Sequence, residues 1–314
     1  MPVSFADYLE AKFALDERSL NRGVREAFLD ALHSLPRVQC LDVGAGTCAT
    51  VRRFLNAALT KPLSVTVLDR DPGLLDIARQ EIPDWLRALG LEPFTEEGII
   101  KTQGERVTAI RFAARELKDY RADRLYNVIT AHAFLDLAPL PQTLRLFSAS
   151  LQPGGYLYAT INYDGNTALL PVYDDVDIEG RLLKHYNQSM EQRRVEGQAT
   201  GGAYCGKRLH ELLPEHEFDI LAHGSSDWNI APVLNEYRDG DFVCLKALLE
   251  MIYSEGQRAG LFSQVELVRW HDDRLRLLHR RRLGLTISHL DLLARYRPGA
   301  SARKHTGRRA TARA

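Results

Sequence analysis

The chain has 314 residues, of which 45% are apolar and 26% are charged, and its 41 basic side chains balance its 41 acidic ones. This length allows one large domain or a domain with a sizeable insertion. The zero formal net charge excludes a whole-protein positive field that would attract nucleic acid. We expect no membrane span, because no run of about 18 apolar residues occurs. The N-terminus lacks a signal-peptide pattern, so a cytoplasmic location is the default expectation.

The four cysteines predict no metal or redox site. None of them forms a CxxC pair, which both kinds of site would favour. The two that flank a glycine-rich segment are expected to be small buried residues. They are Cys40 and Cys48, and the other two are Cys205 and Cys244.

The first part of the chain predicts a helical arm. Apolar residues recur at helical spacing through residues 4–33, and Pro36 ends the pattern. Residues 1–36 are therefore predicted as an N-terminal helical arm.

Apolar runs then alternate with helical segments, which predicts a parallel sheet with helices on both faces. We expect an α/β fold: a Rossmann-like, doubly wound sheet of about seven strands. The predicted strands are 38–43, 63–68, 107–112, 126–130, 156–161, 218–222 and 283–293, with 99–102 as a further short candidate. The predicted helices after the arm are 50–58, 72–81, 140–151, 178–195, 206–213, 241–257 and 262–281.

These elements divide the chain into four parts. Residues 37–165 are predicted to form a ligand-binding core after the arm. Residues 166–296 are predicted to supply helical cover insertions together with the closing strands of the same domain. Residues 297–314 contain no acid and no large apolar residue, so we expect a disordered basic tail.

A glycine loop follows the first predicted strand and suggests a nucleotide-like ligand. Gly44 and Gly46 allow a tight turn close to a ligand, although with Ala49 they also satisfy the relaxed dinucleotide fingerprint. Asp42, two positions before the loop, favours a cationic ligand over a pyrophosphate, which it would repel. Asp69 ends the second strand, where a carboxylate can accept hydrogen bonds from two ribose hydroxyls.

Three segments resemble the class I S-adenosylmethionine-dependent methyltransferases. Residues 42–46, which read Asp-x-Gly-x-Gly, match the first motif of that family, and residues 67–79 look like its second. Residues 151–155, Leu-x-Pro-Gly-Gly, resemble the turn before its fifth strand. Members also commonly carry helices before the first strand. The resemblance covers residues 38–165.

The resemblance implies S-adenosylmethionine as cofactor and assigns contacts residue by residue. Asp42 would lie near the methionine part, Asp69 would hold the ribose, and Arg70 would lie beside the adenine. The family usually has an acid after the third strand, but Ala114 stands there, so backbone groups of Ala114 and Arg115 are expected to serve instead. The other implied contacts are Gly44, Ala45 and Gly46 in the loop, and Thr130 and Ala131 after the fourth strand. Apart from the resemblance, the charged residues 16–22 of the arm are expected to cap a helix. Alternatively the arm closes over the cofactor, and Arg18 or Arg22 reaches its carboxylate.

Two residues are candidates for the chemistry itself. His132 follows the fourth predicted strand, where ligands gather in such sheets, and is the candidate general base or substrate contact. The alternative for His132 is packing against the cofactor or in a loop. Tyr163 follows the fifth strand and is expected to face the pocket mouth.

Further candidates for acceptor binding lie in the second half. Tyr186, Met190 and Arg194 are four residues apart, so they share one face of a predicted helix, which lines a substrate cavity or packs as core. Trp228 follows an acid and suits a cationic or aromatic ligand, or it packs in a turn. His289 lies in an apolar strand and is predicted to be a core histidine.

The leading hypothesis is S-adenosylmethionine-dependent methyl transfer to a small-molecule acceptor by in-line displacement. No membrane partner is expected, and nucleic acid is disfavoured by the balanced charge. The alternatives are an RNA or protein methyltransferase that uses the basic C-terminal region, an NAD-dependent oxidoreductase, and a non-catalytic S-adenosylmethionine-binding protein.

Overall fold

The computed structural model describes residues 3–57, 61–103 and 108–299. The segment 300–314, most of the predicted basic tail, lies outside them. The helices are α1 (Phe5–Ser19), α2 (Arg22–Ser34), α3 (Ala49–Asn56), α4 (Pro72–Ala88), α5 (Leu140–Ser150), α6 (Val176–Gln192), α7 (Cys205–Glu215), α8 (Asp241–Ala259) and α9 (Gln264–His279), with short 3-10 turns η1 (Leu117–Asp119), η2 (Leu135–Leu137) and η3 (Gly202–Tyr204). The strands are β1 (Val38–Val43), β2 (Leu63–Asp69), β3 (Pro93–Glu96), β4 (Ile99–Thr102), β5 (Thr108–Ala114), β6 (Tyr126–His132), β7 (Leu151–Leu170), β8 (Arg194–Val195), β9 (Gln198–Ala199), β10 (Phe218–Ser225), β11 (Trp228–Ile230) and β12 (Gly284–Tyr296).

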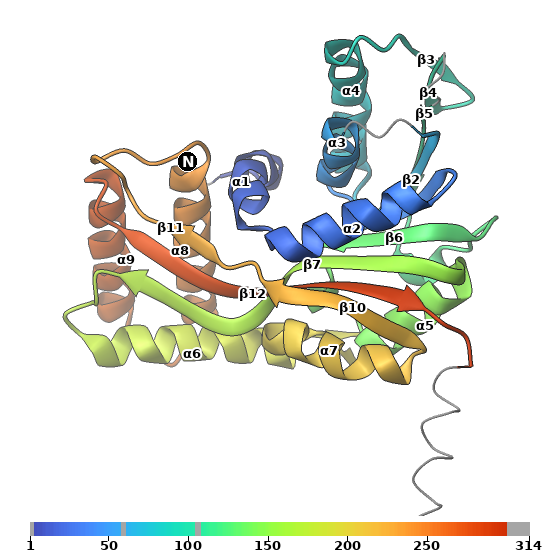
Figure 1. The fold of residues 1–314 in the computed structure, drawn as a ribbon. Coiled ribbons are helices and arrows are strands. Elements are labelled where there is room, and N and C mark those ends of the chain that lie inside the picture. Colours follow the sequence, from blue (N-terminus) through green and yellow to red (C-terminus); the bar gives the residue numbers. More distant parts are fainter. Residues whose placement is uncertain (1–2, 58–60, 104–107, 300–314) are drawn as a thin grey trace, which may run out of the picture.

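One large sheet organises the molecule (Figure 1). Within the described residues it has ten strands in the order β10-β12-β7-β6-β1-β2-β5-β4-β3, with β11 paired to β12 beside this path. The strands β7, β6, β1, β2 and β5 run parallel, and the direction of winding reverses between β1 and β6. The predicted α/β, doubly wound architecture is therefore confirmed. Strand β4 coincides with the further short candidate 99–102, whereas β3 and β11 were not expected from the sequence.

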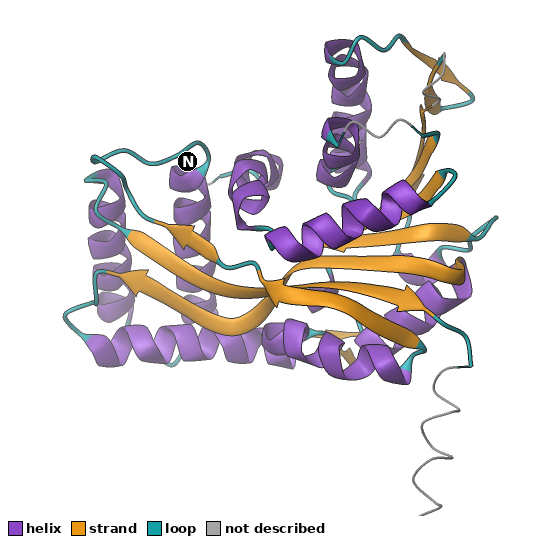
Figure 2. Cartoon of the chain, viewed as in Figure 1, coloured by secondary structure: helices purple, strands orange, loops and turns teal. Residues whose placement is uncertain are grey.

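Helices cover both faces of the sheet (Figure 2). On one face α2, α3 and α4 pack around a core that includes Phe28, Phe54 and Leu75. On the other face α5 and α7 pack around residues such as Leu144 and Leu209. The central strand β1 is buried along almost its whole length because both of its faces are covered.

A third core lies where β7 and β12 extend past the parallel strands. There α1, α6, α8 and α9 surround a cluster that includes Leu15, Leu182, Leu249 and Trp270. Three of these helices, α6, α8 and α9, come from residues 166–296, whereas α1 comes from the segment predicted as the N-terminal arm. Since β7 spans 20 residues, the predicted boundary at residue 165 falls inside one continuous strand.

Two local predictions differ from the structure for identifiable reasons. The N-terminal arm is two helices, because Asn21 caps α2 by accepting a hydrogen bond from the Val24 amide at 3.1 Å. Helix α4 continues through Pro83, which we expected to lie in a broken segment. Ile82 and Leu86 extend its buried apolar face, and their burial outweighs the hydrogen bond that Pro83 cannot make.

In the described part of the chain, no helix combines the length and the apolar character needed to cross a bilayer.

Candidate functional site

A tight loop follows β1 at the point where the winding of the sheet reverses. The amides of Gly44 and Ala45 donate to the carbonyl of Leu68 at 2.9 and 3.1 Å, which fastens the loop to the end of β2. Gly44 and Gly46 have φ angles of +66° and +53°, in the region that glycine adopts without steric cost. Ligands of doubly wound sheets bind at this position, beside the carboxyl ends of the strands.

Asp42 is a buried carboxylate beneath this loop, with 1% of its surface exposed. Its Oδ1 accepts a hydrogen bond from the Thr130 hydroxyl at 2.7 Å. Burial raises the pKa of Asp42 to about 6, although the hydroxyls of Thr130 and Thr50 lower it. Nevertheless Oδ2 completes no hydrogen bond with any described residue. A buried oxygen that accepts no hydrogen bond destabilises the protein, so Oδ2 is available to accept a hydrogen bond from a bound ligand.

Asp69 is half-buried at the end of β2 and lies against the loop. Its Oδ2 accepts from the Gly46 amide at 2.8 Å, and its Oδ1 accepts from the Asp71 amide at 2.9 Å. Each carboxylate oxygen can accept two hydrogen bonds. Asp69 therefore retains one acceptor position on each oxygen.

The residues predicted beside an adenine ring lie at the exposed edge of this region. Arg70 and Ala114 are exposed, and Arg70 Nη1 lies 3.9 Å from Glu116 Oε1. The Arg115 amide already donates to the Asp69 carbonyl at 2.9 Å. Glu116 is thus the acid that follows β5, two residues after the position where the motif expects one.

The residues predicted after the fourth strand lie at the end of β6. Thr130 is bonded to Asp42 as described, and Ala131 is fully buried. His132 has both ring nitrogens occupied: Nδ1 lies 2.8 Å from the Thr160 hydroxyl, and Nε2 lies 2.8 Å from Asp16 Oδ2.

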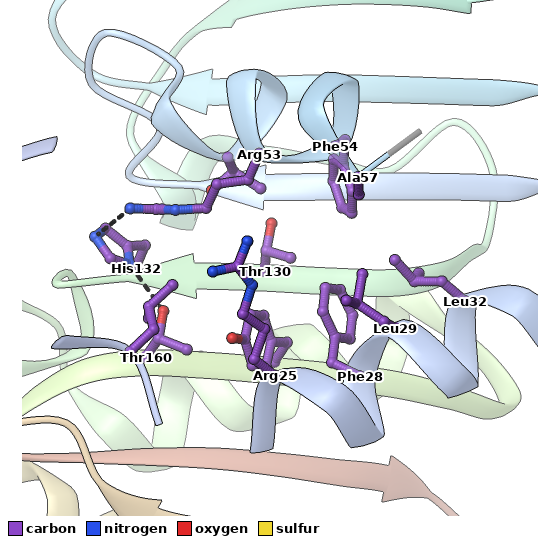
Figure 3. Close-up of a pocket in the computed structure, with 13 residues that line it drawn as sticks. Arg25, Phe28, Leu29, Leu32, Arg53, Phe54, Ala57, Thr130, His132 and Thr160 are labelled. Carbon is purple, nitrogen blue, oxygen red and sulfur yellow. Dashed lines mark hydrogen bonds between the residues drawn. The ribbon is translucent and has the colours of Figure 1, made fainter. Parts of the chain in front are cut away.

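The positively charged side chain of Arg53 also lies beside His132. Arg53 reaches from α3 to within 3.2 Å of the His132 Nε2, as Figure 3 shows. Burial, followed by the charge of Arg53, lowers the pKa of His132 to about 3, so the ring is neutral near pH 7. In this arrangement His132 holds neighbouring elements together and offers no free nitrogen to an acceptor.

Asp16 on α1 is the centre of this polar network. It accepts hydrogen bonds from Trp228 Nε1 at 3.0 Å and from Lys12, in addition to its contact with His132. Burial alone would raise the pKa of Asp16, but Lys12 and His132 hold it well below the usual range. Because the partners come from β6 and β11, the network fastens α1 to the sheet.

Two further ion pairs fix the same helix. Glu17 pairs with Arg53 of α3, and Arg18 pairs with Asp241 at the start of α8. Arg18, predicted to reach a cofactor carboxylate, is therefore paired with a carboxylate of the protein.

The glycine loop is covered directly by side chains. A Cβ atom at Gly46 would lie 3.1 Å from a methyl group of Leu9 on α1. At Gly44 a Cβ atom would overlap the ring of Phe134, which follows β6. A ligand that lies against these glycines therefore requires α1 and Phe134 to shift outward.

Two predicted site residues are engaged inside the protein. Tyr163 is buried, and its hydroxyl bonds Asn187 Oδ1 at 2.7 Å and lies 2.9 Å from the Thr167 hydroxyl. Trp228 lies in β11 with 4% exposure and donates to Asp16. His289, predicted as a core histidine, is indeed buried, 5.3 Å from the Trp228 ring.

The face predicted from Tyr186, Met190 and Arg194 is split. Tyr186 and Met190 are half-buried on α6 and pack against the cover core. Helix α6 ends at Gln192, and Arg194 lies exposed in the hairpin β8–β9, where its guanidinium donates to backbone carbonyls. The expected helical register therefore does not continue to Arg194.

A small cavity lies between α2, α3 and the sheet, beside this region. Its volume is about 40 Å³, and its walls include Arg25, Phe28, Thr130 and Tyr158 (Figure 3). The Tyr158 hydroxyl is buried and has no hydrogen-bond partner in the described ranges. A space of this size holds a few water molecules and not an organic ligand.

The residues that the structure describes contain no group of three or more His, Cys, Asp or Glu side chains arranged to hold a metal ion. The four cysteines are all buried and free of disulfides.

Two acids near the site were not singled out by sequence reasoning. Asp136 follows His132 by four residues and lies in η2, directly after β6. Its position shortly after a strand that ends at the site could have identified it as a candidate site residue. Asp16 gave no such signal, because its partners His132 and Trp228 are 116 and 212 positions away in the chain.

No family model and no curated protein matches this chain. Solved structures with a similar fold include a Bacillus halodurans protein with a proposed methyltransferase function, at 13% identity and a TM-score of 0.48, covering 86% of this chain and 98% of that one. The YcgJ protein of Bacillus subtilis has 10% identity and a TM-score of 0.48, covering 89% of this chain and 100% of that one. A SAM-dependent methyltransferase of Methanosarcina mazei has 13% identity and a TM-score of 0.44, covering 86% and 97%. These are likenesses of fold alone.

Proposed function

We propose that this protein binds S-adenosylmethionine at the glycine loop and transfers its methyl group to a small-molecule acceptor. The observation that carries the proposal is the unpaired Oδ2 of buried Asp42 beneath that loop. An ammonium or a sulfonium is attracted to such a carboxylate, whereas a pyrophosphate is repelled.

The sheet also differs from that of a dinucleotide-binding domain. The dinucleotide sheet continues with a sixth strand beside the fifth. Here β12 takes the place beside β7 and runs antiparallel to it, and β10 lies outside β12. The strand order therefore argues against an NAD-dependent oxidoreductase.

The residues present fit this cofactor in three respects. Asp42 offers an acceptor to the amino group of the methionine part, directly or through water. Asp69 offers one acceptor position on each oxygen to the ribose hydroxyls. Gly44 and Gly46 carry no side chains, so their backbone can face the ligand once Leu9 and Phe134 move outward. Glu116 and the backbone near Ala114 are the groups that would hydrogen-bond the adenine.

When bound, S-adenosylmethionine supplies a methyl group that its sulfonium already makes electrophilic. The protein then has to orient the acceptor in line with the carbon–sulfur bond and to exclude water. Helix α1 and Phe134 cover the loop and are the elements that would enclose the reactants. His132 and Tyr163 are positioning residues in this proposal, because their polar atoms are already bonded to other side chains.

Calorimetry with S-adenosylhomocysteine tests the proposal. We expect wild-type protein to bind it with a Kd in the micromolar range or tighter, and NAD to bind far more weakly. Asp69→Ala removes charged acceptors for two hydroxyls, so its affinity should fall by at least about tenfold. Asp84→Ala, an exposed acid on α4 paired with Arg87, is the matched control and should bind like wild type.

Thermal unfolding of both variants checks that Asp69→Ala still folds, since Asp69 also holds the Gly46 amide. Clear binding of NAD by wild-type protein, with no binding of S-adenosylhomocysteine, would refute the proposed function.

A further inference from the structure

Helix α1 lies directly on the glycine loop. Leu9, Lys12 and Asp16 follow one another at helical spacing, so they share the face of α1 that is turned inward. Leu9 faces Gly46, while Lys12 and Asp16 belong to the polar network described above. Carbon atoms in contact lie about 3.5 to 4.0 Å apart, so no layer of ligand atoms fits between Gly46 and Leu9 while α1 stays there. We call this place the inner position of α1.

The docking surface of α1 is largely polar. Its buried residues are Lys12, Leu15 and Asp16, so two of the three carry a charge. Apolar side chains of similar volume often stabilise a fold more than a buried ion pair does, because the pair loses its solvation. Helix α2, the other helix of the arm, buries only apolar residues, which are Val24, Phe28, Ala31 and Leu32. Of the two helices, α1 is therefore the one that can detach.

A fixed pivot separates the two helices. The Asn21 amide donates to Oδ2 of Asp291 in β12 at 2.9 Å, and the Asn21 side chain donates to the Ser225 carbonyl at 2.9 Å. Asp291 is fully buried, so the start of α2 is anchored in the sheet. Leu20, directly before it, has φ −49° and ψ +133°, outside the helical region. Rotation at residues 19–20 can therefore swing α1 while α2 stays in place.

The central charges of α1 remain paired when the helix moves. Lys12 and Asp16 are four residues apart in one helix, so their ion pair does not depend on docking. The bonds of Asp16 to β6 and β11 are replaced by bonds to water, which reaches the carboxylate once the helix leaves the sheet. Arg18 lies in the last turn, next to the pivot, so its pair with Asp241 moves least. Undocking thus leaves the Lys12 ammonium with its counter-charge.

We propose that α1 is an autoinhibitory helix, which blocks the cofactor loop in its inner position and swings about residues 19–20 to admit S-adenosylmethionine. This inference rests on the proposed cofactor site. After the cofactor has bound, α1 closes over it in an outer position, farther from the loop, and still covers the reactants. In that outer position Asp16 no longer bonds His132 and Trp228.

The contacts of the inner position oppose cofactor binding. A ligand that binds only the open state has its apparent affinity reduced by the fraction of protein in that state. A substitution that weakens the inner contacts, and leaves the loop unchanged, should therefore tighten cofactor binding. A helix that only supports the site gives the opposite result, because the same substitution then weakens binding.

Trp228→Phe tests this on the full chain. It keeps an aromatic ring in β11 and removes the hydrogen bond to Asp16. We expect the Kd of S-adenosylhomocysteine, measured by calorimetry, to become at least about threefold tighter than that of wild type. Tyr237→Phe is the matched control, because the bond that it removes, to the Leu283 carbonyl, does not involve α1. A Kd in Trp228→Phe that equals the wild-type value or is weaker overturns the proposal.

Leu9→Ala tests the same proposal without a change in the sheet. It shortens the side chain that faces Gly46, so it should also bind S-adenosylhomocysteine at least about threefold more tightly than wild type. Phe5→Ala, at an exposed position one turn earlier in α1, is its control and should keep the wild-type Kd. Thermal unfolding of each variant separates a loss of folding from a loss of affinity. Unchanged or weaker binding by folded Leu9→Ala contradicts the proposal.

Tryptophan fluorescence reports the movement itself. The Trp228 indole loses its bond to Asp16 when α1 leaves the inner position. We expect S-adenosylhomocysteine to change the emission of wild type, and most of this change to be absent from Trp228→Phe, which keeps Trp85 and Trp270. An emission change of equal size in both proteins would mean that α1 does not move.

The outcomes separate this inference from the function beneath it. If neither wild type nor any variant binds S-adenosylhomocysteine, the proposed function fails. If all of them bind it with the same Kd, the cofactor site stands and only the autoinhibitory role of α1 fails.

Discussion

Asp42 is a single buried residue whose carboxylate favours a ligand with a hydrogen-bond donor. Its Oδ1 is satisfied by Thr130 on the neighbouring strand β6, and its Oδ2 has no bonded partner in the described structure. An apolar residue here would avoid the desolvation cost, which appears as a pKa raised to about 6. The carboxylate is therefore best explained by a donor that arrives with the ligand.

This pKa gives a prediction for binding. The group is ionised above about pH 6 and protonated below it, so affinity for a cationic ligand should rise with pH through that value. We expect the Kd of S-adenosylhomocysteine to be about tenfold weaker at about pH 5 than at about pH 7.5. Asp42→Asn should bind more weakly at neutral pH and lose this pH dependence. An unchanged pH dependence in Asp42→Asn, measured by calorimetry, would assign the effect to another group.

At the scale of elements, the sequence predicted those features that are formed by consecutive segments of the chain. The glycine loop and Asp69 lie at adjacent strand ends because β1 and β2 are consecutive and parallel. The helical arm was also expected, and its closure over the site was one alternative, but the side chains that dock it were not expected. Asp16 finds His132 and Trp228 only through the fold, and such partners leave no periodic pattern in a single sequence. Arg194 was expected on the same helix face as Tyr186 and Met190. It does not lie there, because α6 ends at Gln192.

The docking of α1 depends on Asp16. Asp16→Asn leaves the buried Lys12 ammonium without its counter-charge, which should cost about 3 to 5 kcal/mol of unfolding free energy. Urea denaturation measures this loss, and hydrogen exchange should be faster in residues 5–19 than in β1. Glu10→Gln, an exposed acid of the same helix, is the control and should change little. If exchange of α1 is equal in wild type and Asp16→Asn, the polar network does not hold the helix.

At the scale of the whole molecule, the cofactor sheet and the cover share their strands. β7 and β12 pair along most of their length, from the parallel sheet into the cover core. Helices α6 and α9 are then joined by a buried bidentate pair: Arg274 Nε and Nη2 bond the two oxygens of Glu179 at 2.7 and 2.6 Å. Because the strands are continuous and the Arg274–Glu179 pair is buried, we predict that the parallel sheet and the helical cover unfold in one transition.

Breaking that ion pair tests the cooperativity. Arg274→Met leaves the Glu179 carboxylate buried and uncompensated, since the Trp270 indole at 2.9 Å would be its remaining described donor. The loss should be about 3 to 5 kcal/mol, a fall in Tm of roughly 5 to 15 °C. Calorimetry should record one transition, shifted as a whole, while Arg269→Met on the exposed side of α9 leaves Tm nearly unchanged. Two resolved transitions, of which only one moves, would mean that the cover unfolds independently of the sheet.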